Sequence, residues 1–208
     1  MLLLAGLSLA APSVAALGVH GGLDVGWLVG GNGAGYRSGF GERLAVGYSL
    51  TSTTEILLAL DHAHYILDDA SAYFVDPATP PEALGGGRDV IGLGAGLRVR
   101  FDLGGAPSTT AGRIRTSPYA RFEAGMAYTR TAVQAAGFDG MVLIRSGSTL
   151  PRLTISLGAE VRTGARVSVL PHLDTTAVIA ADESEVGAVP TWGAEVRVAP
   201  GIDVRVGF

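Results

Sequence analysis

The residues best equipped for chemistry lie in one short cluster, Asp61-His62-Ala63-His64-Tyr65. Two histidines two positions apart on a β-strand point to the same face and can in principle hold a metal ion such as zinc. A structural zinc site takes four ligands and a catalytic one takes three, and no third ligand is evident near this pair. We therefore interpret His62 and His64 as interfacial polar residues and predict no metal site.

Motifs for nucleophilic or cofactor chemistry do not occur in the sequence. The chain has no cysteine, which excludes disulfides, thiolate metal sites and a cysteine nucleophile. Neither the G-x-S-x-G nucleophile elbow nor the H-E-x-x-H zinc motif is present. The run Gly30–Gly35 resembles a phosphate-binding loop but has no Lys-Ser/Thr pair. We predict no catalytic residue, no cofactor and no enzymatic activity.

Composition narrows the class of protein. Glycine accounts for 31 of 208 residues, roughly twice its usual share of about 7%. Charged residues make up 16% of the chain, against about 25% in an average protein. This apolar chain is not disordered, its many glycines disfavour long helices, and beyond the N-terminus it has no run of about 20 apolar residues that could form a membrane helix. The net charge of −4 argues against a nucleic-acid partner.

The first 16 residues, MLLLAGLSLAAPSVAA, resemble a secretory signal peptide. Leu2–Ala11 is a plausible apolar core, and small residues follow at a possible cleavage site. No Lys or Arg precedes the apolar run, so either the true start lies upstream of Met1 or the signal is atypical. We expect residues 1–16 to be removed and residues 17–208 to form a single domain.

From Leu17 onward, apolar and polar or small residues alternate with a period of two, which is typical of strands with two different faces. The alternation is clearest over 91–102, where isoleucine, leucine, valine and phenylalanine alternate with glycine and arginine. It recurs over 19–29, 43–50, 55–61, 120–129, 152–162, 167–174 and 192–208. Leu57 interrupts it in the third segment.

The glycines decide which face points inward. A soluble sandwich would turn the apolar face inward, but its solvent face would need few glycines. If the apolar face meets lipid, glycine, alanine and serine make room inside a narrow barrel, and unpaired backbone groups at an open edge force the sheet to close. The sequence predicts an antiparallel up-and-down transmembrane β-barrel of eight strands, with nine or ten left open because Ala199-Pro200-Gly201 could be a turn.

Long and short connections alternate along the chain, as in transmembrane barrels. The short turns are 51–54 and 164–165, and the connection 103–116 is longer than expected at that end. The predicted long loops are 30–39, 68–88, 132–150 and 178–189. Aromatic residues at the strand ends predict two interfacial girdles, with Trp27, Phe40, Tyr128 and Trp192 near the long loops and Tyr48, Phe101, Tyr119 and Phe208 near the short turns.

Strand alternation places six acids and six bases inside the predicted barrel. These are Asp24, Asp61, Glu123, Glu160, Asp174, Glu195, Arg43, Arg98, Arg121, Arg152, Arg162 and Arg197. Unpaired charges in a narrow barrel are costly, so the pattern favours a salt-bridged plug over a water-filled path. His20 and His172 share the inner parity and are expected to join this network.

Four features together resemble the small outer-membrane β-barrels of Gram-negative bacteria, OmpA-like barrels in particular. They are the signal-like start, the glycine-rich strand Asp89–Asp102, the opening Pro118-Tyr119 and the terminal Val204-Arg205-Val206-Gly207-Phe208. The resemblance implies outer-membrane lipids and lipopolysaccharide as neighbours, and a last strand ending at Phe208 that the barrel-assembly machinery reads. We expect no peptidoglycan-binding domain.

The resemblance also implies a role. We expect a monomeric outer-membrane protein with a structural or surface-interaction role. A narrow channel for small solutes, a lipid A-modifying barrel enzyme and a soluble periplasmic binder remain as alternatives.

Overall fold

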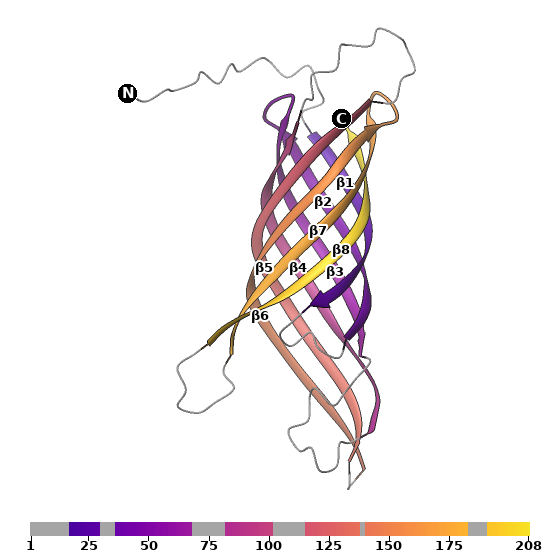
Figure 1. The fold of residues 1–208 in the computed structure, drawn as a ribbon, viewed down its shortest axis with the longest axis vertical. Helices are drawn as coiled ribbons and strands as arrows, with labels where there is room; N and C mark the ends of the chain where they lie inside the picture. The colour runs from indigo at the N-terminus through magenta and orange to yellow at the C-terminus, as the bar shows by residue number, and fades with distance from the viewer. Residues whose placement is uncertain (1–16, 30–35, 68–81, 102–114, 138–139, 183–190) are drawn as a thin grey trace, which may run out of the picture.

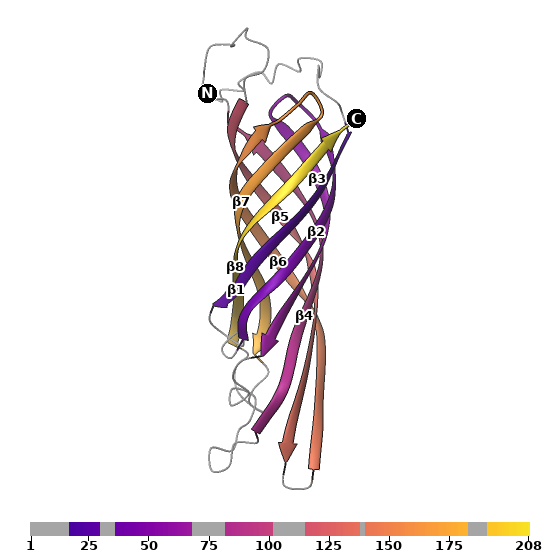
Figure 2. The same ribbon diagram turned by 90° about the vertical axis from the view of Figure 1, so that its right-hand side faces the viewer.

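Eight antiparallel strands close into one barrel (Figures 1 and 2). This computed structural model describes residues 17–29, 36–67, 82–101, 115–137, 140–182 and 191–208. The strands are β1 (Leu17–Val29), β2 (Tyr36–Ser49), β3 (Thr54–Leu67), β4 (Glu82–Arg100), β5 (Arg115–Gly137), β6 (Gly140–Arg162), β7 (Val167–Asp182) and β8 (Thr191–Gly207). Each pairs with its neighbours in sequence, and β1 pairs with β8 to close the ring. The predicted fold class and the count of eight strands are confirmed, whereas the predicted signal peptide lies outside the described residues.

Two short connections mark one end of the barrel, here called the turn end. Residues 50–53 join β2 to β3, and residues 163–166 join β6 to β7. In the first of them the Thr51 hydroxyl accepts hydrogen bonds from the backbone N–H groups of Thr53 and Thr54, at 3.1 and 2.9 Å. The backbone N–H of Phe208 donates to the carbonyl oxygen of Leu17 at 2.9 Å, so the start of β1 and the residue after β8 meet here. The opposite end is called the loop end.

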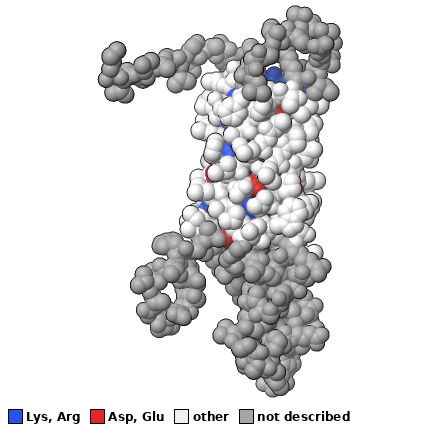
Figure 3. Space-filling model, in the orientation of Figure 1, with Lys and Arg blue, Asp and Glu red and all other residues white. Residues whose placement is uncertain are grey.

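The alternation of the sequence becomes two faces with different chemistry. Large apolar side chains cover the outside of the barrel, where Leu58 is 58% exposed and Leu157 is 62% exposed. In the view of Figure 3 most of the described surface carries no charge. The inside carries most of the buried polar and charged side chains. None of the described residues forms a helix that is long and apolar enough to cross a membrane.

The last predicted segment forms a single strand that runs through Pro200. The β1–β8 ladder skips the positions around Pro200, between the pairs Asp24↔Gly201 and Trp27↔Val198. Proline has no N–H to donate, so a local gap is expected there. Pro200 is exposed on the outer face and the strand direction is kept, so the chain makes no turn. The alternative of nine or ten strands is therefore wrong for the described residues.

Strand structure covers residues 82–88 of one predicted long loop and most of another, 132–150. β4 begins at Glu82, inside the predicted loop 68–88, and β5 and β6 pair throughout the predicted loop 132–150, up to Gly137↔Gly140. In Figure 2 these strands continue well past the rest of the barrel at the loop end. Beyond the apolar outer surface, backbone hydrogen bonds between the strands are enough to hold such an extension together. The side chains on its two faces therefore need not differ in polarity. The alternation that reveals a strand is therefore weak there.

Glycines on the inner face stand where another side chain or a backbone oxygen needs the space. A Cβ on Gly92 would collide with the side chains of Arg152 and Asp61, and a Cβ on Gly41 would collide with those of Arg197 and Asp24. A Cβ on Gly96 would run into the carbonyl oxygen of Phe122, which cannot move without distorting β5. The inner glycines thus set how closely the interior can be filled.

Replacing Gly96 with alanine should lower the free energy of unfolding by about 1–3 kcal/mol, because the added methyl overpacks against fixed backbone. Gly21→Ala is the control, since a Cβ on Gly21 meets nothing within 4 Å. Urea unfolding in lipid vesicles, followed by tryptophan fluorescence, measures both. Equal stability of the two variants would contradict this account of the interior.

Candidate functional site

The twelve charged residues predicted to face the interior differ in burial. Arg98, Arg121, Glu123, Arg152, Glu160, Asp174 and Glu195 are buried. Asp24, Arg43, Asp61 and Arg197 are partly covered, and each pairs with an opposite charge on another strand. Arg162 differs from these, because its side chain is 38% exposed and pairs with Glu160, two positions back on its own strand β6.

Sequence reasoning missed several interior charges. Glu55, Asp203, Arg205 and Arg100 have the inner parity and pair inside the barrel. Arg88 fell in a predicted loop and instead pairs with Glu195 at 2.8 Å. With these included, eight arginines meet eight carboxylates inside the described barrel. The arginines are Arg43, Arg88, Arg98, Arg100, Arg121, Arg152, Arg197 and Arg205, and the acids are Asp24, Glu55, Asp61, Glu123, Glu160, Asp174, Glu195 and Asp203.

A first cluster fills the turn end around Glu55 of β3. Arg98 and Arg205 approach its carboxylate at 2.7 and 3.2 Å, and His20 lies 3.4 Å from it. Arg98 also lies 3.4 Å from Glu160 and so joins the two acids. Its guanidinium stacks 5.6 Å from the centre of the Tyr119 ring.

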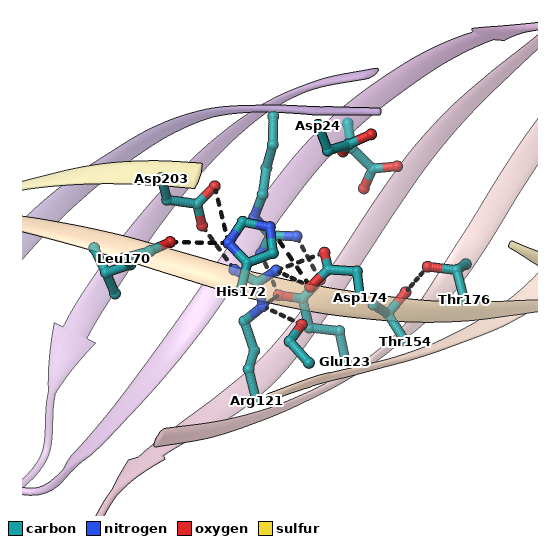
Figure 4. A network of polar contacts seen from close by, with 12 residues as sticks. Asp24, Arg121, Glu123, Thr154, Leu170, His172, Asp174, Thr176 and Asp203 are labelled. Atoms are coloured by element: carbon teal, nitrogen blue, oxygen red, sulfur yellow. Dashed lines mark hydrogen bonds and ion pairs between the residues drawn. The ribbon is translucent and has the colours of Figure 1, made fainter. Parts of the chain in front are cut away.

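A second cluster surrounds Arg121 in the middle of the barrel (Figure 4). Arg121 is 2% exposed and donates to Asp203, to Asp174 and to the Ser156 hydroxyl, each at 2.8 Å. Its Nε also lies 3.4 Å from Glu123. One guanidinium therefore joins three strands, β6, β7 and β8, to its own strand β5.

His172 lies beside this second cluster, as Figure 4 shows. Its Nδ1 lies 3.0 Å from the carbonyl oxygen of Leu170, and its Nε2 lies 3.6 Å from Asp174. His20 and His172 thus both lie within the charged interior, one in each cluster.

Ion pairs continue from the second cluster to the loop end. Arg43 donates to Glu123 through both of its terminal nitrogens, one of them at 3.0 Å. Arg152 pairs with Asp61 and lies 3.8 Å from Glu123, and Arg197 pairs with Asp24. Buried charges are stable only when paired in this way, because each ion loses several kcal/mol of hydration. The arrangement is suited to holding strands together across the interior.

The histidine pair at 62 and 64 lies on the outer face. His62 and His64 are about half exposed, and His64 Nδ1 lies 2.8 Å from Asp89 on β4. Glu42 on β2 lies 3.4 Å from His62. Within the described part of the chain, no group of three or more His, Asp or Glu side chains is arranged to hold a metal ion.

The predicted girdles are partly corrected by the structure. Trp27, Phe40, Tyr128, Tyr48, Phe101 and Phe208 are exposed on the outer face. Tyr119, in contrast, is 1% exposed and points into the barrel, because it has the same parity as Arg121. The position of Tyr119 near a strand end predicts a place in the girdle, whereas its place in the alternation of β5 predicts an inward side chain. The side chain of Trp192 is outside the described part of the structure.

Replacing Arg121 with alanine should lower the free energy of unfolding by about 3–5 kcal/mol, since it leaves Asp174 and Asp203 buried without their partner. Arg162→Ala at the exposed rim should cost less than about 1 kcal/mol. Urea unfolding in vesicles compares the two. Adding Asp174→Asn and Asp203→Asn to Arg121→Ala should recover part of the loss, and no recovery would contradict the charge argument.

No protein-family model and no curated protein sequence matches the chain. Solved structures do match it. Neisserial surface protein A is 16% identical, with a TM-score of 0.56 over 93% of this chain and 98% of that one. Outer membrane protein OprG from Pseudomonas aeruginosa is 11% identical, with a TM-score of 0.50 over 95% of this chain and 98% of that one. The chain therefore has the fold of the small eight-stranded outer-membrane barrels.

Proposed function

We propose that this protein is an integral outer-membrane protein of a Gram-negative bacterium, with a structural or surface-interaction role and no enzymatic activity. The observation that carries the proposal is the outer face, where large apolar side chains are exposed on all eight strands. A soluble monomer rarely exposes a continuous apolar patch above a few hundred Å². If lipid surrounds the whole barrel, these apolar side chains do not contact water, and the free-energy cost of exposing them is removed.

The height of the apolar surface supports this location. On β4 and just beyond it, the outward positions from Ile91 to Phe101 are all apolar, and the next outward residue towards the loop end is Asp89. Ten residue steps of about 3.3 Å, tilted by about 40°, rise by about 25 Å. That matches the apolar band of outer-membrane barrels, about 25 Å tall. Asp89 and its histidine neighbours then lie near the level of the lipid headgroups.

The interior supports a barrel closed to solutes. An eight-stranded barrel is just wide enough for its own side chains to fill, and here paired arginines and carboxylates occupy it from the turn end to the loop end. We propose that these pairs form a plug rather than the lining of a narrow channel. The role of the protein would then lie in its contacts with the membrane and the cell surface.

The proposed neighbours follow from this location. Outer-membrane lipids and lipopolysaccharide would cover the apolar face of a monomer. Phe208 directly follows β8 and is exposed. We propose that the barrel-assembly machinery reads this end of the strand. A specific relation to OmpA-like barrels stays a prediction.

Membrane integration has a direct test. The protein should partition with the outer-membrane fraction, require detergent for extraction, and migrate differently on a gel before and after boiling, because a folded barrel resists unfolding by detergent alone. Protein that remains soluble without detergent would contradict the proposal and favour a soluble periplasmic binder.

The plug has a separate test. Purified protein in planar bilayers should give no discrete conductance steps, while a porin preparation in the same bilayers gives them. Reproducible conductance steps from the folded protein would contradict the proposed plug and support a narrow channel. A change in the mass of lipid A on expression would instead favour a lipid-modifying enzyme.

A further inference from the structure

A small chamber lies inside the loop end of the barrel, beyond the second cluster. It has a volume of about 20 Å³ and is bounded by charged, hydroxyl and apolar side chains from six strands. The polar residues are Asp61, Tyr65, Arg152, Thr176, Glu195 and Arg197. Four of them, Asp61, Arg152, Glu195 and Arg197, also belong to the ion pairs described above.

Several polar atoms of these lining residues have no hydrogen-bond partner among the described residues. The donors are the Tyr65 hydroxyl, Nε of Arg197, and Nε and one Nη of Arg152. The acceptors include Oδ2 of Asp61. Tyr65 is fully buried, so its hydroxyl does not contact bulk solvent. A buried hydroxyl without a partner loses the hydrogen bonds that it makes in water, at a cost of about 1–3 kcal/mol.

The size and charge of the chamber limit what can bind there. A water molecule needs at least about 10–15 Å³ of such space and two to four polar partners, and this chamber offers both. The lining acids Asp61 and Glu195 balance the lining bases Arg152 and Arg197, so the chamber favours neither an anion nor a cation. A neutral guest that both donates and accepts is required.

We propose that this chamber is a binding site for ordered water, held by Tyr65, Asp61, Arg152 and Arg197. The water supplies the hydrogen bonds that these groups do not obtain from one another. It also partly hydrates the Asp61–Arg152 pair, which reduces the desolvation cost of this ion pair. This proposal is independent of the proposed function. It would hold whether or not the barrel conducts ions and whichever membrane contains the protein.

The Tyr65→Phe variant tests the proposal through the sign of its effect. Removing a hydroxyl that binds water should lower the urea midpoint of unfolding, whereas removing a hydroxyl that has no partner should leave the midpoint unchanged or raise it. Tyr119→Phe is the matched control. Tyr119 is also buried with an unpartnered hydroxyl among the described residues, but it does not line the chamber.

The expected pattern is a lower midpoint for Tyr65→Phe and no decrease for Tyr119→Phe. An unchanged or higher midpoint for Tyr65→Phe overturns the water site. A decrease of the same size in both variants also overturns the water site. It would show that losing a buried tyrosine hydroxyl lowers the midpoint even where the hydroxyl does not line the chamber.

A second measurement observes the water itself. In nanodiscs, the arginine Nε–H signals of Arg152 and Arg197 should show NMR cross-peaks to water. That of Arg121 should show none, because its Nε donates to Ser156 at 2.8 Å. Absence of the Arg152 and Arg197 cross-peaks, or equal cross-peaks at all three arginines, overturns the proposal.

Discussion

Closure of the backbone ladder is the constraint on which the rest of this structure depends. In the lipid bilayer that we propose for this protein, no water can satisfy a free strand edge, so β1 must pair with β8 and the sheet must form a ring. A ring of eight strands fixes the width of the interior. Every inward side chain must then fit a space that the strand count has already set, and every outward side chain must tolerate hydrocarbon.

The interior meets this constraint by combining the smallest residue with one of the largest. Gly92 lies against the Asp61–Arg152 pair, and Gly41 lies against Asp24 and Arg197. An arginine reaches across the interior only because a glycine leaves it room. The pairing of opposite charges then makes it tolerable to bury these arginines. Some of the pairs also tie together strands that are not neighbours in the ring, as Asp61–Arg152 does for β3 and β6.

Alternation in the sequence was sufficient to predict the fold class, the number of strands and the inward direction of Arg98 and Arg121. It could not predict partners across the interior, because these depend on strand tilt and register. Arg205 and Glu55 meet although 150 positions separate them. It also failed where one principle opposed another. The place of Tyr119 near a strand end predicts the girdle, whereas its alternation with outward residues predicts the interior. The weak alternation over residues 132–150 predicts a loop where β5 and β6 in fact pair.

The inner glycines also limit how such a sequence can drift over evolutionary time. A larger residue at Gly92 or Gly41 is acceptable only if the charged pair beside it shrinks at the same time, so inner positions change as compensated sets. Outer positions need only remain apolar, and they can exchange one aliphatic residue for another independently. The two faces can therefore change by different routes while the ring is preserved. Two sequences that follow only these rules can share the fold at 11–16% identity.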